Sequence, residues 1–315
     1  VILPVVPMFH ANAWGLAHAG VATGATLVMP GANLAAGALA DLIESEKVTL
    51  AAGVPTIWMG VLPELEGRDV SSLRAIPCGG SAVPRTLSEG YRKATGLPIL
   101  QAWGMTETSP VSFQTAPDDP LDRRVGTVGR IHPHVEAKVI DSEGRTVSPG
   151  EPGELCTRGY LVMLGYWGDA ERTAEAVDAA GWMHTGDLAT IDAEGYCEIV
   201  GRIKDMVIRG GENVYPREIE EYLYGHPSIE DVQVIGVPDE RFGEQLCACI
   251  KLRDGASVTT EQIQDFCKGQ IAHFKIPHYV RIVDSFPMTV TGKIQKFVMR
   301  EQMIQELELV KERTA

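Results

Sequence analysis

Two short motifs carry hydroxyl, carboxylate and ammonium groups in settings that suit chemistry on a phosphate. Thr106 and Glu107 are adjacent in a glycine-containing loop that follows an apolar, strand-like segment, and Lys293 follows a Thr-Gly turn. A hydroxyl can donate to a phosphate oxygen, a carboxylate suits Mg²⁺, and a lysine ammonium stabilises developing negative charge. Either motif alone occurs on many protein surfaces, but together they predict a site for a phosphate and a metal.

The elements that must position the first motif lie in the N-terminal third of the chain. Residues 1 to about 105 alternate short apolar runs with helical patterns, which is typical of a parallel sheet covered by helices. Ligands of such sheets bind beyond the carboxyl ends of the strands, so we expect the site at the loops 78–81 and 103–105. The predicted strands are 2–6, 26–29, 48–51, 73–78 and 99–102.

The pattern of residue types changes twice after this region. From about 125 to 200, short strands alternate with turns rich in Asp, Ser, Gly and Pro, which predicts a small, mostly antiparallel barrel or sandwich with one helix near 170–176. The remainder has an α+β pattern. Its predicted helices are 216–225, 260–272 and 295–312, and its predicted strands are 229–237, 245–252 and 279–283.

The predicted fold class is therefore α/β, with an incomplete parallel-sheet subdomain over about 1–120 and a small β-barrel subdomain over about 121–201. Together these form the C-terminal part of a large domain ending at 201. We expect a hinge at 202–205 and a small, mobile α+β domain over 206–315. The chain opens directly on a buried-strand pattern without a methionine, which predicts a chain cut within a domain.

Composition limits the classes of function. The net charge of −14 argues against a protein that binds nucleic acid or anionic membranes through its overall field. No segment is apolar enough to span a bilayer and no signal peptide opens the sequence, so we expect a cytoplasmic protein. The six cysteines lack the spacing of zinc ligands, which favours reduced thiols over a disulfide framework.

Ordered motifs along the whole chain resemble those of the adenylate-forming superfamily of acyl-CoA synthetases, luciferases and nonribosomal adenylation domains. The resemblance is greatest to medium- and long-chain fatty-acyl-CoA ligases. The motifs that carry it are Pro7-Met8-Phe9-His10, Gly79-Gly80-Ser81, Trp103-Gly104-Met105-Thr106-Glu107, Thr185-Gly186-Asp187, Gly201-Arg202-Ile203-Lys204-Asp205, Gly210-Gly211-Glu212-Asn213 and Thr291-Gly292-Lys293.

The resemblance implies a nucleotide site around the two N-terminal loops. Thr106 and Glu107 would contact the ATP phosphates and Mg²⁺, although a polar loop cap would have the same residues. Gly79 and Gly80 would let the purine and the acyl carboxyl end approach the backbone, and Trp103 would offer a stacking face. A plain glycine turn is the alternative. Further implied contacts in these loops are Ser81, Gln101, Ala102 and Gly104.

Three further residues would contact the nucleotide from later in the chain. Asp187 and Arg202 would bind the ribose hydroxyls; a turn aspartate and a surface arginine are the alternatives. Lys293 would stabilise charge between the carboxylate and the α-phosphate, where loss of such a group typically costs about 10²–10³ in rate. The alternative is a solvated turn lysine.

The remaining implied roles concern the second substrate, the acid and the domain motion. Lys204 would be the hinge residue, and Gly210 and Gly211 would line a pantetheine channel, a role compatible with a simple hairpin turn. Trp14 would gate the acyl tunnel and His10 would lie near the reacting carboxyl. If 11–17 is helical, His10 and Trp14 share a face; a short-acid ligase could use the same tryptophan to close its pocket.

The function implied is an ATP-dependent fatty acid:CoA ligase that forms acyl-AMP with Mg²⁺ and then acyl-CoA. Rival hypotheses are a ligase for a short or sulfur-containing acid such as 3-methylmercaptopropionate, a ligase that loads a carrier protein or stops at the adenylate, and a non-catalytic binding module. A homodimer is possible. The family's phosphate loop is not found in these residues, so we expect that the 315-residue chain alone does not turn over ATP.

Overall fold

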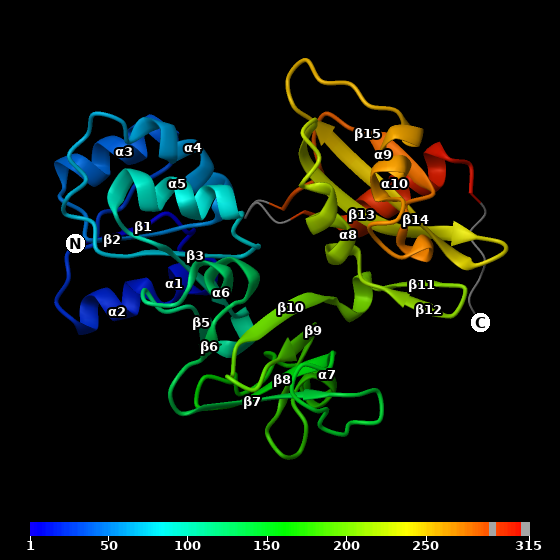
Figure 1. Cartoon of the computed structure of the whole chain (residues 1–315). Coiled ribbons are helices and arrows are strands. Elements are labelled where there is room, and N and C mark those ends of the chain that lie inside the picture. Colours follow the sequence, from blue (N-terminus) through cyan, green and yellow to red (C-terminus); the bar gives the residue numbers. More distant parts are fainter. Residues whose placement is uncertain (290–293, 310–315) are drawn as a thin grey trace. The chain divides into compact units, whose positions relative to one another are not determined.

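The computed structural model describes residues 1–289 and 294–309 (Figure 1). Contacts divide the chain into two compact units. The larger comprises Val1–Thr185 and Ala189–Ile199, and the smaller comprises Gly186–Leu188 and Val200–Ala315. The hinge at 202–205 concerns motion between the units, and it stays a prediction.

A mainly parallel sheet forms the first part of the larger unit. β1 (Ile2–Pro4) pairs parallel with β2 (Leu50–Ala52), and β3 (Ile76–Gly79) pairs parallel with β4 (Ile99–Trp103). Isolated parallel bridges, Leu50 to Ala75 and Gly53 to Cys78, connect β2 with β3. The parallel sheet predicted from the sequence is thus found. It continues into antiparallel β5 (Phe113–Gln114) and β6 (Arg130–Ile131), so the arrangement is mixed.

The predicted strand at 26–29 is wrong. Only an isolated bridge between Leu27 and Ile2 is formed there. The apolar run was a correct sign of packing, since Val28 is buried against the rest of the sheet. A short apolar run reports burial more reliably than it reports a ladder of backbone hydrogen bonds.

Three helices cover one face of this sheet: α3 (Ala36–Ser45), α4 (Pro55–Glu64) and α5 (Arg85–Thr95) (Figure 1). Alternate strand residues such as Leu3, Ile76 and Ile99 point into the core between the sheet and the helices. At its centre Trp58 and Tyr91 pack edge to face, with ring centroids 6.2 Å apart. Burial of each such large side chain contributes about 1.5–3 kcal/mol, and this core fixes the strand ends that carry the site.

A second, smaller sheet completes the larger unit and corrects the predicted barrel. It consists of β7 (Val135–Ile140), β8 (Gly153–Gly159), β9 (Met183–Ile191) and β10 (Cys197–Arg202), in the order β10-β9-β8-β7. All of residues 121–201 are described, and the sheet stays open there because four strands are too few to close around a packed interior. Of the helices in this range, α7 (Ala170–Ala176) lies where it was predicted, and α6 (Leu121–Gly126) contacts β4 of the first sheet.

The smaller unit is an α+β sandwich, as predicted. Its sheet has the order β12-β11-β14-β13, with β15 paired parallel to β14. The strands are β11 (Val207–Arg209), β12 (Glu212–Val214), β13 (Ile229–Asp239), β14 (Gly243–Leu252) and β15 (Tyr279–Ile282). The helices are α8 (Pro216–Leu223), α9 (Thr260–Cys267) and α10 (Lys296–Glu306), all three shorter than predicted. Short 3₁₀ turns occupy Ile203–Asp205 and His273–Lys275.

Alternation along β14 places helices on both faces of this sheet. Leu246 and Ala248 belong to the core formed with α8 and α9, whereas Cys247 and Cys249 belong to the core formed with α10. The two cysteines that alternate in the sequence are therefore packing residues. All six cysteines of the chain are buried free thiols.

On the side of β13 that faces away from β14, side chains form hydrogen bonds with the backbone groups of the strand. The Val234 amide donates to Glu220 Oε1 over 2.7 Å, and Lys296 Nζ donates to Glu220 Oε1 over 2.6 Å and to the Val234 carbonyl over 3.1 Å. Arg300 donates to the carbonyl of Gly236, two residues further along the strand.

Within the described part of the chain, no helix combines the length and hydrophobicity needed to cross a membrane.

Candidate active site

The loop after β4 holds Thr106 and Glu107 in a short 3₁₀ turn, Thr106–Thr108. The Thr108 hydroxyl accepts from the Met105 amide over 3.1 Å and closes this turn, while the Thr106 side chain is exposed. Gly104 is required at the start of the loop, since a Cβ there would lie 1.6 Å from the Pro110 carbonyl oxygen. The glycine-broken loop predicted from the sequence is therefore a rigid turn that presents a hydroxyl and a carboxylate.

Glu107 is held by a second loop that sequence reasoning missed. Tyr166 donates its hydroxyl to Glu107 Oε1 over 2.9 Å, and the Met163 amide donates to the Glu107 carbonyl over 2.8 Å. Burial, with a smaller contribution from Glu107, raises the pKa of Tyr166, so its hydroxyl remains a donor at neutral pH. The signal for this contact was weak, because 59 residues separate the partners.

The half-buried Glu107 carboxylate fits a magnesium ion. Mg²⁺ prefers hard oxygen ligands, keeps several waters, and is usually held by one or two carboxylates together with phosphates. A carboxylate on a fixed turn with access to solvent satisfies those requirements. Glu107 would hold the ion, which would neutralise phosphate charge when bound.

The two glycine loops predicted at strand ends do meet. Gly79 of β3 pairs with Ala102 of β4, and a Cβ on Gly79 would lie 2.8 Å from the Ala102 carbonyl oxygen. Gln101 is buried, and its Oε1 accepts from the Val83 amide over 3.2 Å, so its side chain anchors the loop after β3. Gly80 and Ser81 are exposed at the rim of that loop, and Gly80 has a φ of +87°.

Two aromatic residues flank these loops. The terminal ring atom Cη2 of Trp14 lies 3.5 Å from where a Gly79 Cβ would be, which places the proposed gate directly against the glycine loop. Trp103, half-buried, packs edge to face on Phe113 with ring centroids 5.9 Å apart. The structure thus brings Trp14, Gly79 and the end of β4 together, and the role of Trp14 as a gate stays a prediction.

The segment that carries His10 and Trp14 does not meet the condition under which the two residues would share a face. Residues 11–17 do not form one right-handed helix, because α1 (Ala11–Trp14) is a left-handed turn with φ between 48° and 56° at all four residues. Gly15 then leads into the right-handed helix α2 (Leu16–Ala22). His10 and Trp14 therefore do not share a face of one right-handed helix. The Trp14 amide does approach the His10 carbonyl at 3.5 Å.

The two candidate ribose ligands bond to each other. Arg202 Nε donates to Asp187 Oδ1 over 3.0 Å; the carboxylate is buried, while 62% of the arginine side chain is exposed. The arginine thus holds the Asp187 carboxylate in place while most of its own side chain stays exposed to solvent. Thr185, two residues before Asp187, donates to the Leu155 carbonyl over 2.7 Å and secures the start of the motif on β8.

Three further predicted residues lie in the last third of the chain. Gly210 and Gly211 form the two-residue turn of the β11–β12 hairpin with φ of +61° and +88°, values that suit glycine. Lys204 is exposed in the 3₁₀ turn Ile203–Asp205. Lys293 lies outside the described residues, so its role stays a prediction.

None of the described thiols with a raised pKa is suited to act as a nucleophile. Burial raises the pKa of Cys156 to about 12 and that of Cys267 to about 11. Reactive cysteines need thiolate character at neutral pH. Cys156 nevertheless has polar neighbours, Glu154 and His184, that sequence reasoning did not connect with it because β8 and β9 are far apart in the chain.

Comparisons with known proteins agree over both units. Residues 1–167 match the family described as AMP-binding enzyme, and residues 218–293 match the AMP-binding enzyme C-terminal domain. The chain is 44% identical over 313 residues to the medium-chain acyl-CoA ligase ACSF2, mitochondrial, of Rattus norvegicus, covering 98% of this chain and 51% of that protein. It is 49% identical over 271 residues to YngI of Bacillus subtilis, covering 85% of this chain and 49% of that protein.

The fold is shared with a solved structure as well. ATP-bound MatB from Rhodopseudomonas palustris has a TM-score of 0.88 and 33% identity, covering 96% of this chain and 60% of that chain. The chain spans about half the length of the curated relatives it matches. The cytoplasmic location and the homodimer expected from the sequence stay predictions, and the rat relative is mitochondrial by name.

Proposed function

Because this chain belongs to the AMP-binding enzyme family, as its motifs predicted, we propose that its protein is an ATP-dependent fatty acid:CoA ligase of the medium- or long-chain type. The observation that carries the proposal is the 44% identity over 98% of the chain to a relative named as a medium-chain acyl-CoA ligase. The fixed Thr106–Glu107 turn beside the paired glycine loops supplies the matching local chemistry.

The first half-reaction joins the acid to the nucleotide. A carboxylate oxygen attacks the α-phosphorus of ATP, the bond to the β-phosphate oxygen breaks, and pyrophosphate leaves with the electron pair. Thr106 would donate to a phosphate oxygen and Glu107 would hold Mg²⁺, which would neutralise phosphate charge, while Asp187 would accept bonds from ribose hydroxyls. Lys293 stabilises the charge that develops between the two reacting groups.

The second half-reaction transfers the acyl group. The thiol of coenzyme A attacks the acyl carbon, the thiol proton is lost to solvent, and AMP leaves. The Gly210-Gly211 turn has no side chains to obstruct the pantetheine arm, and Trp14 closes the acyl tunnel beside Gly79. His10, in the motif Pro7-Met8-Phe9-His10 that resembles the fatty-acyl-CoA ligases, would lie near the reacting carboxyl group.

The proposal is tested by separating the half-reactions in the full-length protein. Lys293→Ala should reduce acyl-adenylate formation by about 10²–10³, as for loss of one oxyanion donor, and should spare thioester formation from supplied acyl-AMP. Pyrophosphate release and acyl-CoA formation are the measurements. Lys268→Ala, which removes an exposed lysine of the same unit, is the matched control. Equal loss in both half-reactions would remove Lys293 from this role.

Substrate profiling identifies the class of carboxylic acid that the enzyme activates. Adenylate formation across straight-chain acids of graded length should be greatest for medium or long chains. A maximum with short or sulfur-containing acids would favour the rival ligase class, and CoA-independent product release would favour another acyl acceptor.

A further inference from the structure

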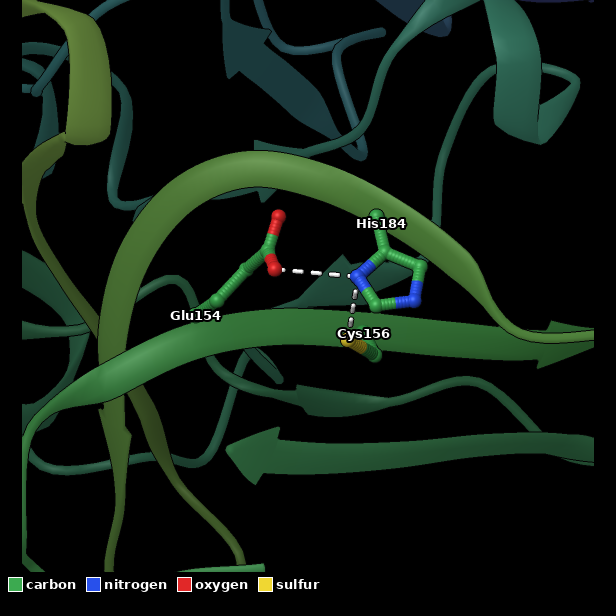
Figure 2. Close-up of side chains that lie close together, drawn as sticks. All are labelled: Glu154, Cys156 and His184. Atoms are coloured by element: carbon green, nitrogen blue, oxygen red, sulfur yellow. Dashed lines mark hydrogen bonds and ion pairs between the residues drawn. The ribbon is translucent and has the colours of Figure 1, made fainter. Parts of the chain in front are cut away.

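We propose that Glu154, Cys156 and His184 form a zinc-binding site on the small sheet of the larger unit (Figure 2). Glu154 and Cys156 are two residues apart on β8 and so point to the same side of the sheet, while the Leu155 side chain between them lies in the core. His184 reaches the pair from β9. The carboxylate oxygen, the sulfur and the ring nitrogen all lie within 4.8 Å of one another.

Two further potential ligand atoms converge on the Nδ1 atom of His184. Glu154 Oε2 lies 2.9 Å from His184 Nδ1, and Cys156 Sγ lies 3.7 Å from the same nitrogen. A protonated Nδ1 carries one hydrogen and can direct it to one acceptor; an unprotonated Nδ1 could accept from the thiol but would then face the carboxylate with a lone pair. A cation between the three atoms would be bound by the nitrogen, the carboxylate oxygen and the sulfur together.

The distances are close to those of a tetrahedral zinc ion. With Zn–S near about 2.3 Å and Zn–N or Zn–O near about 2.0–2.2 Å, neighbouring ligand atoms are roughly 3.3–3.6 Å apart. The observed separations of 2.9 and 3.7 Å from Nδ1 lie on either side of this range, and the carboxylate oxygen and the sulfur lie within 4.8 Å of each other. A thiolate and an imidazole favour zinc over magnesium or calcium, which prefer oxygen ligands.

The surroundings supply an outer carboxylate. Metal-bound histidines almost always donate their second ring N–H to a carboxylate, a carbonyl or water. Asp178 Oδ2 lies 4.0 Å from His184 Nε2, and its other oxygen is fixed by the amides of Ala180 and Trp182 over 2.9 and 2.8 Å. The acid is therefore held on the correct side of the ring, within reach of a small rotation or one bridging water.

The charge balance also suits a dication. Lys138 pairs across from Cys156 on β7, and its ammonium lies 4.4 Å from the Trp182 ring centroid. Zinc binding would displace the Cys156 thiol proton to solvent, and the resulting thiolate together with the Glu154 and Asp178 carboxylates would offset this ammonium and the divalent ion. The side chains of His184 and Glu154 are 31% and 21% exposed, which leaves a solvent-facing position for a water as fourth ligand.

Metal titration of the full-length protein tests the site. We expect about one Zn²⁺ per chain by calorimetry, and Co²⁺ in its place should give a thiolate-to-cobalt charge-transfer band, which requires a cysteine ligand. Cys156→Ala should abolish the band, and His184→Gln should weaken zinc binding at least ~100-fold, beyond the about 10–100-fold typical of outer-shell changes. Asp178→Asn, which keeps the turn acceptor, should weaken it by about 10-fold.

Two controls keep the result interpretable. Cys267→Ala removes a buried thiol from α9 of the other unit and should leave the band unchanged. Far-ultraviolet circular dichroism of each variant verifies folding, and Glu154→Gln provides a second ligand change that leaves the sulfur in place. Absence of stoichiometric zinc binding, a cobalt spectrum without the charge-transfer band, or unchanged affinity in folded Cys156→Ala would each overturn the proposal. The outcome is independent of the proposed ligase activity.

Discussion

Glu107 depends on one long-range hydrogen bond for its position. The turn fixes its backbone, but the carboxylate is oriented by Tyr166, whose hydroxyl lies 2.9 Å from Oε1. A hydrogen bond to a charged group contributes about 1.5–3 kcal/mol. An ion held by this carboxylate would therefore be sensitive to a residue that need not contact the nucleotide.

Tyr166→Phe should raise the magnesium concentration needed for half-maximal adenylation by about 10-fold, which corresponds to about 1.4 kcal/mol. The ring is retained, so stability should change little. Tyr160→Phe is the matched control, since Tyr160 lies in the same loop and is 78% exposed. Pyrophosphate release measured against magnesium concentration gives the result, and an unchanged dependence would exclude a positioning role for Tyr166.

Local motifs could be predicted from the sequence, whereas partners from distant strands could not. The Thr106–Glu107 pair and the two glycine loops were found because residues adjacent in the sequence and the ends of apolar runs can be recognised from the sequence alone. Tyr166 and the Glu154, Cys156 and His184 cluster depend on the order of strands in the small sheet, which turn residues alone do not determine.

Among the elements, the left-handed turn α1 (Ala11–Trp14) is the strongest departure from expectation. Left-handed backbone costs an L-residue roughly 1–2 kcal/mol, so four in succession require support from their surroundings. Ala13 is fully buried and Trp14 packs against the glycine loop, and these contacts hold the turn. A helix was only a condition in the sequence analysis, and residue types alone carry no information on the handedness of a turn.

Ala11→Gly and Ala17→Gly form a matched pair that measures this strain. Glycine in right-handed α2 costs about 1 kcal/mol, so Ala17→Gly should lower the free energy of unfolding by that amount. In Ala11→Gly, the relief of left-handed strain offsets the entropic cost of glycine. The free energy of unfolding should therefore stay unchanged or rise by up to about 1 kcal/mol. Urea denaturation measures both, and equal destabilisation would show that the turn is not strained.

At the scale of the whole molecule, the chain consists of two units with separate cores. Asp187 and Arg202 of the smaller unit are bonded to each other, and Lys204 follows in an exposed 3₁₀ turn. A hinge at this point would let one unit serve two half-reactions in turn.

Lys204→Pro should reduce thioester formation more than adenylate formation, by about 10-fold or more, because proline fixes φ and restricts the preceding residue. Lys204→Ala keeps backbone freedom and should leave both half-reactions near their original rates. Single-turnover assays of each step compare the variants. Equal losses in the two steps would argue against a pivot at this residue.

The side chains along β13 have a consequence for self-association. An exposed edge strand can pair with a strand from another molecule, and many proteins aggregate in this way. Here Glu220 and Lys296 occupy the outward amide and carbonyl of Val234, and Arg300 occupies the next outward carbonyl, at Gly236. A strand from another molecule would have to displace a carboxylate and two cations before it could form backbone hydrogen bonds here. These side chains therefore protect the edge strand β13 from intermolecular pairing.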